Sequence, residues 1–189
     1  MNLNPIQSIK EICFNAAQPL LNVYNQELKS CYTFEINMSD VGDYNHIDIR
    51  YSEPYKSLFQ DLMAIKGPVL YWFEVISQHS SHDILKAFER YKNDPDCKAI
   101  PALKSKLEHG TNILYVGKVK TQFWGRFITH LGFFKTNRTQ GIQLFYWAKT
   151  LGLHLRVHVY EFDKNMADLM TIVEFGMAQK LKPLLGKHK

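Results

Sequence analysis

Cysteine is scarce in this sequence, and the spacing of the few cysteines excludes two classes of small protein. The three residues, Cys13, Cys31 and Cys97, lie far apart among 189 residues and form no CxxC pair. A zinc knuckle needs closely spaced thiolates, and a disulfide scaffold needs more cysteines. We therefore expect reduced cysteines that act as ordinary small side chains.

Long hydrophobic runs are absent as well. No run of about 18 consecutive apolar residues occurs, the length that a membrane-spanning helix needs. The first residues lack the basic start and the apolar block of a secretory signal. The sequence therefore predicts a cytoplasmic protein with no membrane partner. Apolar residues make up 46% of the chain, enough to bury the core of one domain with an extension.

Acidic residues are few in the C-terminal part of the chain. Residues 112–189 hold 12 Lys and Arg against 4 Asp and Glu, whereas residues 1–66 hold 5 against 8 and residues 67–111 hold 6 against 6. The excess positive charge therefore lies at the C-terminal end. Such a segment suits a polyanion, most commonly the phosphate backbone of a nucleic acid. A basic surface without a partner remains the alternative.

The hydrophobic patterns predict both strands and helices. Apolar residues three or four apart indicate helices, and alternation indicates strands. Pro19, Gly67 and Pro183 are expected to break or end helices, and Asn165 to cap the last one. The expected strands are residues 31–40 and 46–52, joined by a β-hairpin turn or a short loop, and residues 69–77, 112–119 and 153–162. The expected helices are residues 5–29, as one or two helices, then 53–67, 83 onward with a second short helix before 110, 123–132, 141–152 and 165–182.

These elements predict an α+β fold, with a small, mainly antiparallel sheet surrounded by helices. We expect residues 67–189 to form the main domain, with a helical insertion at 79–110. Residues 1–66 are expected to form an N-terminal α/β extension packed on that domain.

Several chemistry-bearing residues stand in a distinctive order. The segment NILYVGKVKTQFWGRFITHLG, residues 112–132, joins a strand to a helix that carries Arg126 and His130 four residues apart. Residues at that spacing lie on one side of a helix. Further along, Glu174 lies among Met, Val, Phe and Gly residues, where an unpaired carboxylate would be costly. A buried Glu of this kind needs a partner or a metal ion.

Together with an earlier aromatic strand, this order resembles the GIY-YIG nuclease superfamily over residues 68–186. VLY, which ends at Tyr71, is similar to the first signature, and YVG, which begins at Tyr115, is similar to the second. GRFITH supplies an Arg and a His at the superfamily's spacing, and VEFGMAQKLKP resembles its helix with the acidic residue.

Two features depart from the superfamily pattern. The first is the separation of Tyr71 from Tyr115 by 44 positions, which is longer than in many members. Some restriction-enzyme members carry insertions at this place. The second is Gly186, which stands where an Asn usually follows the Lys-Pro pair.

The resemblance implies a metal-dependent endonuclease that hydrolyses phosphodiester bonds in DNA, of the restriction type. The implied catalytic residues are Tyr71, Tyr115, Arg126, His130 and Glu174, with Glu174 as the ligand of Mg²⁺ or Mn²⁺.

The same residues suit the chemistry on physical grounds. A single carboxylate with water and phosphate ligands suits Mg²⁺. Arg126 offers a planar charged fork to the scissile phosphate. A tyrosine with a pKa of about 10 is a poor base at neutral pH. Tyr115 would need help from the metal, from Arg126 or from His130, which is a second candidate base.

We expect double-stranded DNA as the partner, held by lysines near the site. The expected nucleic-acid-binding residues are Lys118, Lys120, Lys180 and Lys182. An enzyme with one active site per chain needs a homodimer or two successive nicks to cut both strands. Gly186 favours an alternative, a catalytically silent nucleic-acid-binding module of the same fold. A protein-interaction domain unrelated to nucleic acid is a third hypothesis.

Each of these residues also has a plainer interpretation. Without the resemblance, Tyr71 would be read as a core residue, and Arg126 with His130 as a solvated helix face. A competing metal site could be formed in DYNHID by Asp43, His46 and Asp48. A solvated polar face explains those three residues more simply. The same holds for the alternating set His154, Arg156 and His158.

Overall fold

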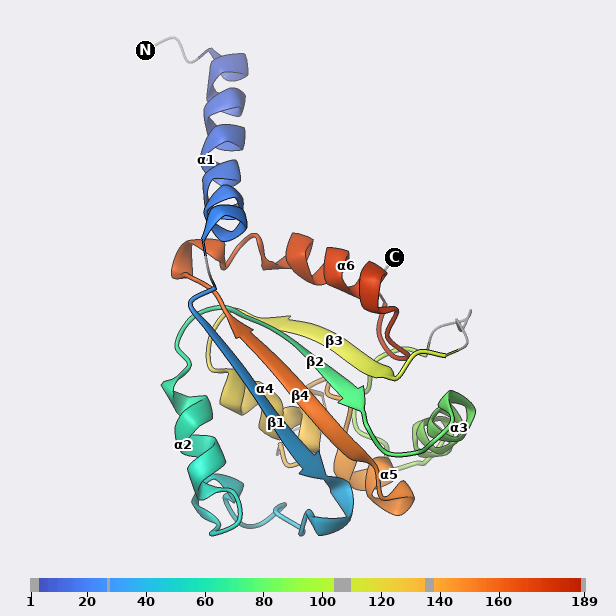
Figure 1. Ribbon diagram of the computed structural model, residues 1–189. Helices are drawn as coiled ribbons and strands as arrows, with labels where there is room; N and C mark the ends of the chain where they lie inside the picture. Colours follow the sequence, from blue (N-terminus) through green and yellow to red (C-terminus); the bar gives the residue numbers. More distant parts are fainter. Residues whose placement is uncertain (1–3, 27, 104–109, 135–137, 188–189) are drawn as a thin grey trace.

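The computed structural model describes residues 4–26, 28–103, 110–134 and 138–187 (Figure 1). At its centre is a four-stranded sheet in the order β1-β4-β2-β3. Every neighbouring pair of strands is antiparallel. The strands are β1 (Ser30–Asn37), β2 (Val69–Val75), β3 (Ile113–Val119) and β4 (His154–Glu161). The predicted α+β class with a small antiparallel sheet is confirmed.

Helices cover both faces of this sheet (Figure 1). The α-helices are α1 (Pro5–Asn25), α2 (Lys56–Ala64), α3 (Ser81–Lys92), α4 (Phe123–Leu131), α5 (Leu144–Leu151) and α6 (Met170–Leu181). Three short 3₁₀ helices are η1 (Met38–Asp40), η2 (Ile49–Tyr51) and η3 (Lys164–Met166). The larger core joins one sheet face to α2, α3, α4 and α5, and a smaller core joins the other face to α6.

Successive side chains of a strand point to opposite faces of the sheet, and this alternation explains the two cores. In β4, the predicted inward set Leu155, Val157 and Val159 is buried in the larger core. In β2, Tyr71 faces the same core, whereas Leu70 faces α6 in the smaller core. Because β2 lies between two strands and under helices on both faces, its run of aromatic and aliphatic residues is buried on both sides.

The predicted strand at residues 46–52 is wrong. Residues 49–51 form η2 instead, and β1 pairs with β4 over eight residue pairs. Asp48 explains the change, because its carboxylate accepts hydrogen bonds from the backbone amide of Arg50 at 3.1 Å and from the Arg50 side chain. Such local side-chain bonds favour a tight turn over a strand.

Several predicted helix boundaries are also wrong. Pro19 lies inside an unbroken α1, which is exposed, so water can reach the carbonyl that the proline leaves unpaired. Ser80 caps α3 by accepting a hydrogen bond from the amide of Asp83 at 3.1 Å. Asn165 belongs to η3, because α6 begins only at Met170. Residues 93–103 form no second helix, and residues 104–109 lie outside the described residues.

Gly67 lies beyond the end of α2 and serves a different purpose from the one expected. A Cβ atom at this position would meet the carbonyl oxygen of Phe162 and the side chain of Glu161. The Glu161 carboxylate accepts hydrogen bonds from the amide of Gly67 at 2.7 Å and from Lys29 Nζ at 2.6 Å. Glycine at this position therefore lets the chain pass close to the end of β4. There the Glu161 side chain holds the start of β1 by hydrogen bonds.

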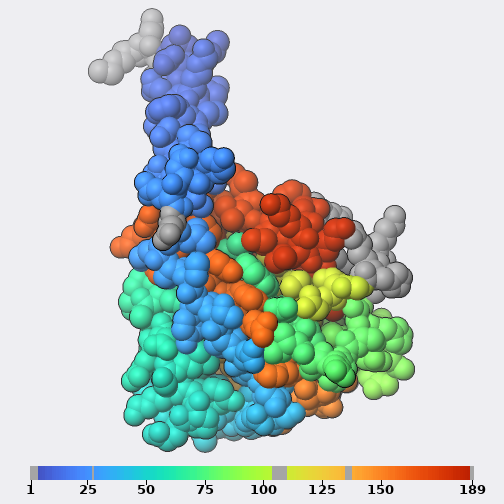
Figure 2. Space-filling model, in the orientation of Figure 1, coloured from blue at the N-terminus to red at the C-terminus, as the bar shows by residue number. Residues whose placement is uncertain are grey.

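Helix α1 stands away from the rest of the molecule (Figures 1 and 2). None of its residues, all of which the structure describes, is buried. Only its C-terminal part, through Leu20 and Val23, packs against the smaller core. Across the described ranges, no helix is both long and apolar enough to cross a membrane.

The C-terminal segment covers part of the edge of β3. The amide of Leu184 donates to the carbonyl of Ile113 at 2.8 Å, and the amide of Leu185 donates to the carbonyl of Leu114 at 3.0 Å. Gly186 follows with φ of 108°, and its amide donates to the carbonyl of Ala102 at 2.9 Å. A positive φ suits glycine and strains Asn and other residues. The local backbone therefore accounts for glycine at 186.

Candidate active site

The structure brings the predicted site residues together from four elements. Tyr71 lies on β2, Tyr115 on β3, Arg126 with His130 on α4, and Glu174 on α6. The tyrosine rings are 6.3 Å apart, and the His130 ring is 5.1 Å from the Tyr115 ring. The charge of Glu174 acts on both phenols and on Arg126.

The hydroxyl of Tyr71 is held by two donors. Arg126 Nε donates to it at 3.0 Å, and His130 Nε2 lies 2.8 Å away. His130 Nδ1 accepts a hydrogen bond from the amide of Ile142 at 3.2 Å, which places the ring proton on Nε2. The Tyr71 oxygen therefore accepts two hydrogen bonds, and its own proton is directed to a further acceptor.

Tyr115 is that acceptor. Its phenol ends the series of hydrogen bonds that runs from His130 and Arg126 through Tyr71. Burial raises the pKa of the Tyr115 phenol, whereas Arg126 and hydrogen bonds from Arg126 and Tyr71 oppose the rise. Burial likewise raises the pKa of Tyr71. Both phenols are therefore neutral at neutral pH. The donors around the Tyr115 oxygen are those that would stabilise its phenolate when it gives up a proton.

His130 orients this chain of donors. Its side chain is fully buried, and burial together with the nearby charge of Arg126 holds its pKa well below the ordinary value. Both ring nitrogens are hydrogen-bonded, so neither has an unused lone pair for a proton. In this arrangement His130 positions Tyr71, and a role as base would require the ring to leave the Ile142 amide.

Gly117 makes room for the tyrosines. It pairs with Tyr71 across the sheet, and a Cβ atom there would lie 2.5 Å from the Tyr71 hydroxyl and 2.6 Å from Tyr115 Cε1. Gly117 lies inside β3 and not at a turn. The turn into α4 is made by Gln122, whose φ of 55° is left-handed.

Arg126 is a cation that is partly buried beside the two phenols. Burial opposes its charge, but Tyr71 and Tyr115 act in the other direction and its pKa is raised. Its Nη1 donates to the carbonyl of Gln140 at 2.5 Å. Sequence patterns could not identify Gln140 and Ile142 as site residues, because both contribute backbone atoms. The guanidinium is thus fixed, with its charge permanently present.

Glu174 reaches the same place from the other side of β3. β3 is an edge strand, and its Lys118 amide donates to the Glu174 carboxylate. Burial raises the pKa of Glu174, and Lys118 and Arg126 oppose the rise. A half-buried carboxylate near a fixed cation and two phenols can bind a hard cation, with water and phosphate as its other ligands.

The donor set fits a metal ion that takes one protein ligand. Within the described residues, no group of three or more His, Cys, Asp or Glu residues lies together in a way that could hold a metal ion. Glu174 would therefore act as a single carboxylate ligand. Mg²⁺ accepts such a site, because it keeps several waters and binds phosphate oxygens.

The four lysines expected to bind nucleic acid lie on β3 and α6 or directly after them, and these two elements pack together. Lys118 Nζ donates to the hydroxyl of Thr171 at 2.7 Å, and Lys120 Nζ lies 2.5 Å from the carboxylate of Asp168. Lys180 is exposed in the last turn of α6, and Lys182 is exposed just after it. The lysines therefore flank the two elements that carry Tyr115 and Glu174.

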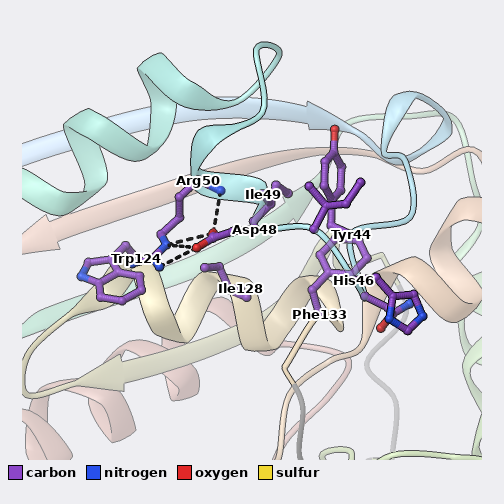
Figure 3. Close-up of a pocket in the computed structure, with 10 residues that line it drawn as sticks. Tyr44, His46, Asp48, Ile49, Arg50, Trp124, Ile128 and Phe133 are labelled. Carbon is purple, nitrogen blue, oxygen red and sulfur yellow. Dashed lines mark hydrogen bonds and ion pairs between the residues drawn. The ribbon is translucent and has the colours of Figure 1, made fainter.

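Of the competing residues in DYNHID, His46 and Asp48 line a separate pocket of about 490 Å³, shown in Figure 3, and Asp43 does not. There the Asp48 carboxylate accepts hydrogen bonds from Arg50, whose guanidinium lies 4.7 Å from the Trp124 ring. Asp43 caps its own turn through the amide of Asn45 at 2.8 Å. The metal site considered for Asp43, His46 and Asp48 is therefore not formed.

The alternating polar residues of β4 are tied to carboxylates. Arg156 donates to Glu35 of β1 at 2.8 Å, and His158 Nε2 lies 2.9 Å from Glu74 of β2. His154 lies 3.2 Å from Glu35. Arg156 and Glu35 thus form a cross-strand ion pair, and the two histidines add polar cross-strand contacts, which together stabilise the sheet. The nearby carboxylates offset the positive charge that a phosphate would need.

No protein-family model, no curated protein and no solved structure significantly matches this chain. Support for a function therefore comes from the geometry of the site itself.

Proposed function

We propose that this protein is a metal-dependent DNA endonuclease with a core like that of the GIY-YIG nucleases. The observation that carries the proposal is the meeting of Tyr71, Tyr115, Arg126, His130 and Glu174 at one edge of the sheet. Packing alone does not explain why a partly buried Arg, a buried His and two phenols, one buried and one partly buried, share one hydrogen-bonded network beside a half-buried carboxylate.

The residues of the site divide the work of phosphodiester hydrolysis. Arg126 offers its charge to the phosphoryl oxygens, where negative charge grows in the transition state. Tyr115 can take the proton of the attacking water only as its phenolate, so its own proton must first pass to solvent, and Tyr71 and Arg126 stabilise that phenolate. His130 keeps Tyr71 aligned as a donor. Glu174 would hold Mg²⁺ or Mn²⁺, which when bound stabilises the leaving oxygen.

The lysines support a duplex substrate. Lys118, Lys120, Lys180 and Lys182 lie on the two elements beside the site or directly after them, and residues 112–189 carry the excess positive charge. Phosphate contacts of this kind position the backbone without reading the sequence of bases. We propose restriction-type cleavage of double-stranded DNA as the activity that such a site serves.

The test is incubation of supercoiled plasmid with the protein and Mg²⁺ or Mn²⁺. We expect the parent to nick or linearise the plasmid. Glu174→Gln and Arg126→Ala should each lower the rate by at least about 100-fold, as for loss of one charge-stabilising group. Glu35→Gln, on the far strand β1, is the matched control and should cleave as the parent does.

The outcomes separate the proposal from its alternatives. Equal cleavage by the parent and by Glu174→Gln would contradict the site. Salt-sensitive binding of DNA by all variants without cleavage would instead identify a catalytically silent nucleic-acid-binding module. Absence of both cleavage and binding would favour a protein-interaction domain.

A further inference from the structure

Helix α1 carries an apolar seam with a regular spacing. Successive members are three and four residues apart in alternation, which is the heptad pattern of a coiled coil. The seam consists of Ile6, Ile9, Cys13, Ala16, Leu20 and Val23. Ile12, Phe14 and Leu21 lie beside or off this seam and are also exposed, so α1 carries more apolar surface than its contact with the smaller core covers.

The two ends of the seam have different surroundings. Leu20 and Val23 pack against the smaller core of the same chain. Ile6 and Ile9 are 66% and 59% exposed, and Cys13 is exposed as well. Figures 1 and 2 show why, because the helix continues past the edge of the body into open space. One continuous seam is thus covered at one end and bare at the other.

The composition of α1 indicates what covers the bare end. Its only charged residues are Lys10 and Glu11, so two copies of the helix do not repel each other. A helix that lies on a bilayer usually has a polar face rich in Lys and Arg, and this face carries mainly Asn, Gln and Ser. A two-fold interface needs a surface that is complementary to itself, and an apolar heptad seam meets that condition.

We propose that residues 6–16 of α1 pair with the same residues of a second copy of this chain in a two-stranded coiled coil. The dimer carries two active sites, as cleavage of both strands of a duplex requires. The use of the dimer to cleave both strands rests on the proposed function. The pairing of the two helices rests on the exposed seam alone.

The mass of the full chain in solution, measured by sedimentation without DNA, tests the pairing. We expect a dimer for the parent. Ile9→Glu should raise the dissociation constant by roughly 100-fold or more, because it buries two unpaired charges in the seam. Phe14→Glu is the matched control, since Phe14 is 65% exposed on the same helix but lies off the seam. Circular dichroism checks that both variants keep their helix content.

A parent that stays monomeric up to roughly 100 µM would overturn the proposal, and so would a dimer that Ile9→Glu leaves intact. Co-sedimentation of a monomeric parent with phosphatidylglycerol vesicles, lost in Ile9→Glu, would assign the seam to a membrane surface instead. Failure of the proposed function gives a different result, a dimer that cuts no DNA. If both hold, Ile9→Glu nicks the plasmid but linearises it more slowly than Phe14→Glu does.

Discussion

Tyr71 depends on two residues that take no direct part in chemistry. Gly117 leaves the space that its hydroxyl occupies, and His130 holds that hydroxyl at 2.8 Å. Neither role could be predicted from residue type alone. The sequence did predict that Tyr71, Tyr115 and His130 belong to one site, because their order and spacing resemble a known pattern.

A methyl group at residue 117 should disturb both phenols. Gly117→Ala would place its Cβ atom 2.5 Å from the Tyr71 hydroxyl, and overpacking of this kind costs about 1–3 kcal/mol. We expect a lower free energy of unfolding in urea. Gly176→Ala in α6 is the control, since nothing lies within 4 Å of the added atom. Because alanine favours helix, this control should be as stable as the parent or more so. Equal losses in both variants would contradict the role of Gly117.

The buried imidazole of His130 should make stability depend on pH. Its pKa is depressed in the folded protein by burial and by Arg126, so below about 6.5 the unfolded chain binds a proton that the folded chain does not. The free energy of unfolding should then fall by about 1.4 kcal/mol per pH unit as the pH drops below that value.

His130→Gln isolates this effect, because the amide can keep both hydrogen bonds and does not titrate. Its unfolding free energy, measured in urea between pH 5 and pH 7, should fall less steeply than that of the parent. His82→Gln, at an exposed position, should keep the parent's slope. A slope that His130→Gln leaves unchanged would show that another group titrates.

At the scale of elements, the strands were predicted well and their partners were not. Alternation identified β1, β3 and β4, and the aromatic and β-branched residues of β2 identified that strand. The partner of β1 depends on β4, which lies more than a hundred residues further along the chain, and no local pattern contains that information. The hydrogen bonds that the Asp48 carboxylate accepts also favoured η2 over the strand expected at residues 46–52. Helix ends were missed where capping depended on the neighbours rather than on Pro or Gly.

The junction of β1 with β4 offers a test at this scale. Glu161 is 5% exposed and accepts hydrogen bonds from Lys29, from Ser30 and from the amides of Lys66 and Gly67. Burial opposes its charge, but these donors hold its pKa below the usual value. Glu161→Gln removes the charge that pairs with Lys29 and one of the two acceptor oxygens, whereas the remaining oxygen can still accept from Lys29 and the two amides. It should lower the unfolding free energy by about 1–2 kcal/mol.

Glu35→Gln provides the comparison for that experiment. Glu35 also forms ion pairs, with Arg156 and His154, but its side chain is 43% exposed. Water screens such pairs, so its replacement should change stability far less. Urea unfolding of the two variants at pH 7 checks the difference, and equal effects would mean that burial of Glu161 is not what matters.

At the scale of the whole molecule, residues 30–66 and residues 67–189 share one sheet and one core. β1 is bonded along its length to β4, and α2 packs against α4. The proposed boundary after residue 66 thus falls inside a hydrogen-bonded junction. Dividing the sequence at residue 66 by composition could not reveal the shared sheet, because composition does not indicate which strands become neighbours.

This sharing predicts cooperative unfolding. Hydrogen exchange in urea, followed by mass spectrometry, should show peptides from β1 and from β3 losing protection at the same urea concentration. The exposed N-terminal part of α1 serves as the internal reference, because it should exchange early at every concentration. Earlier loss of protection in β1 than in β3 would instead indicate that residues 1–66 unfold as a separate unit.

The cover on the edge of β3 also has a consequence for biosynthesis. A ribosome makes the chain from the N-terminus, so Glu174 and the segment at Leu184–Leu185 are among the last described residues to emerge. Until then β3 has an open edge, and Tyr115 has no carboxylate beside it. A nascent chain thus has every strand before it has a complete site. The candidate site is therefore complete only once synthesis has passed residue 185.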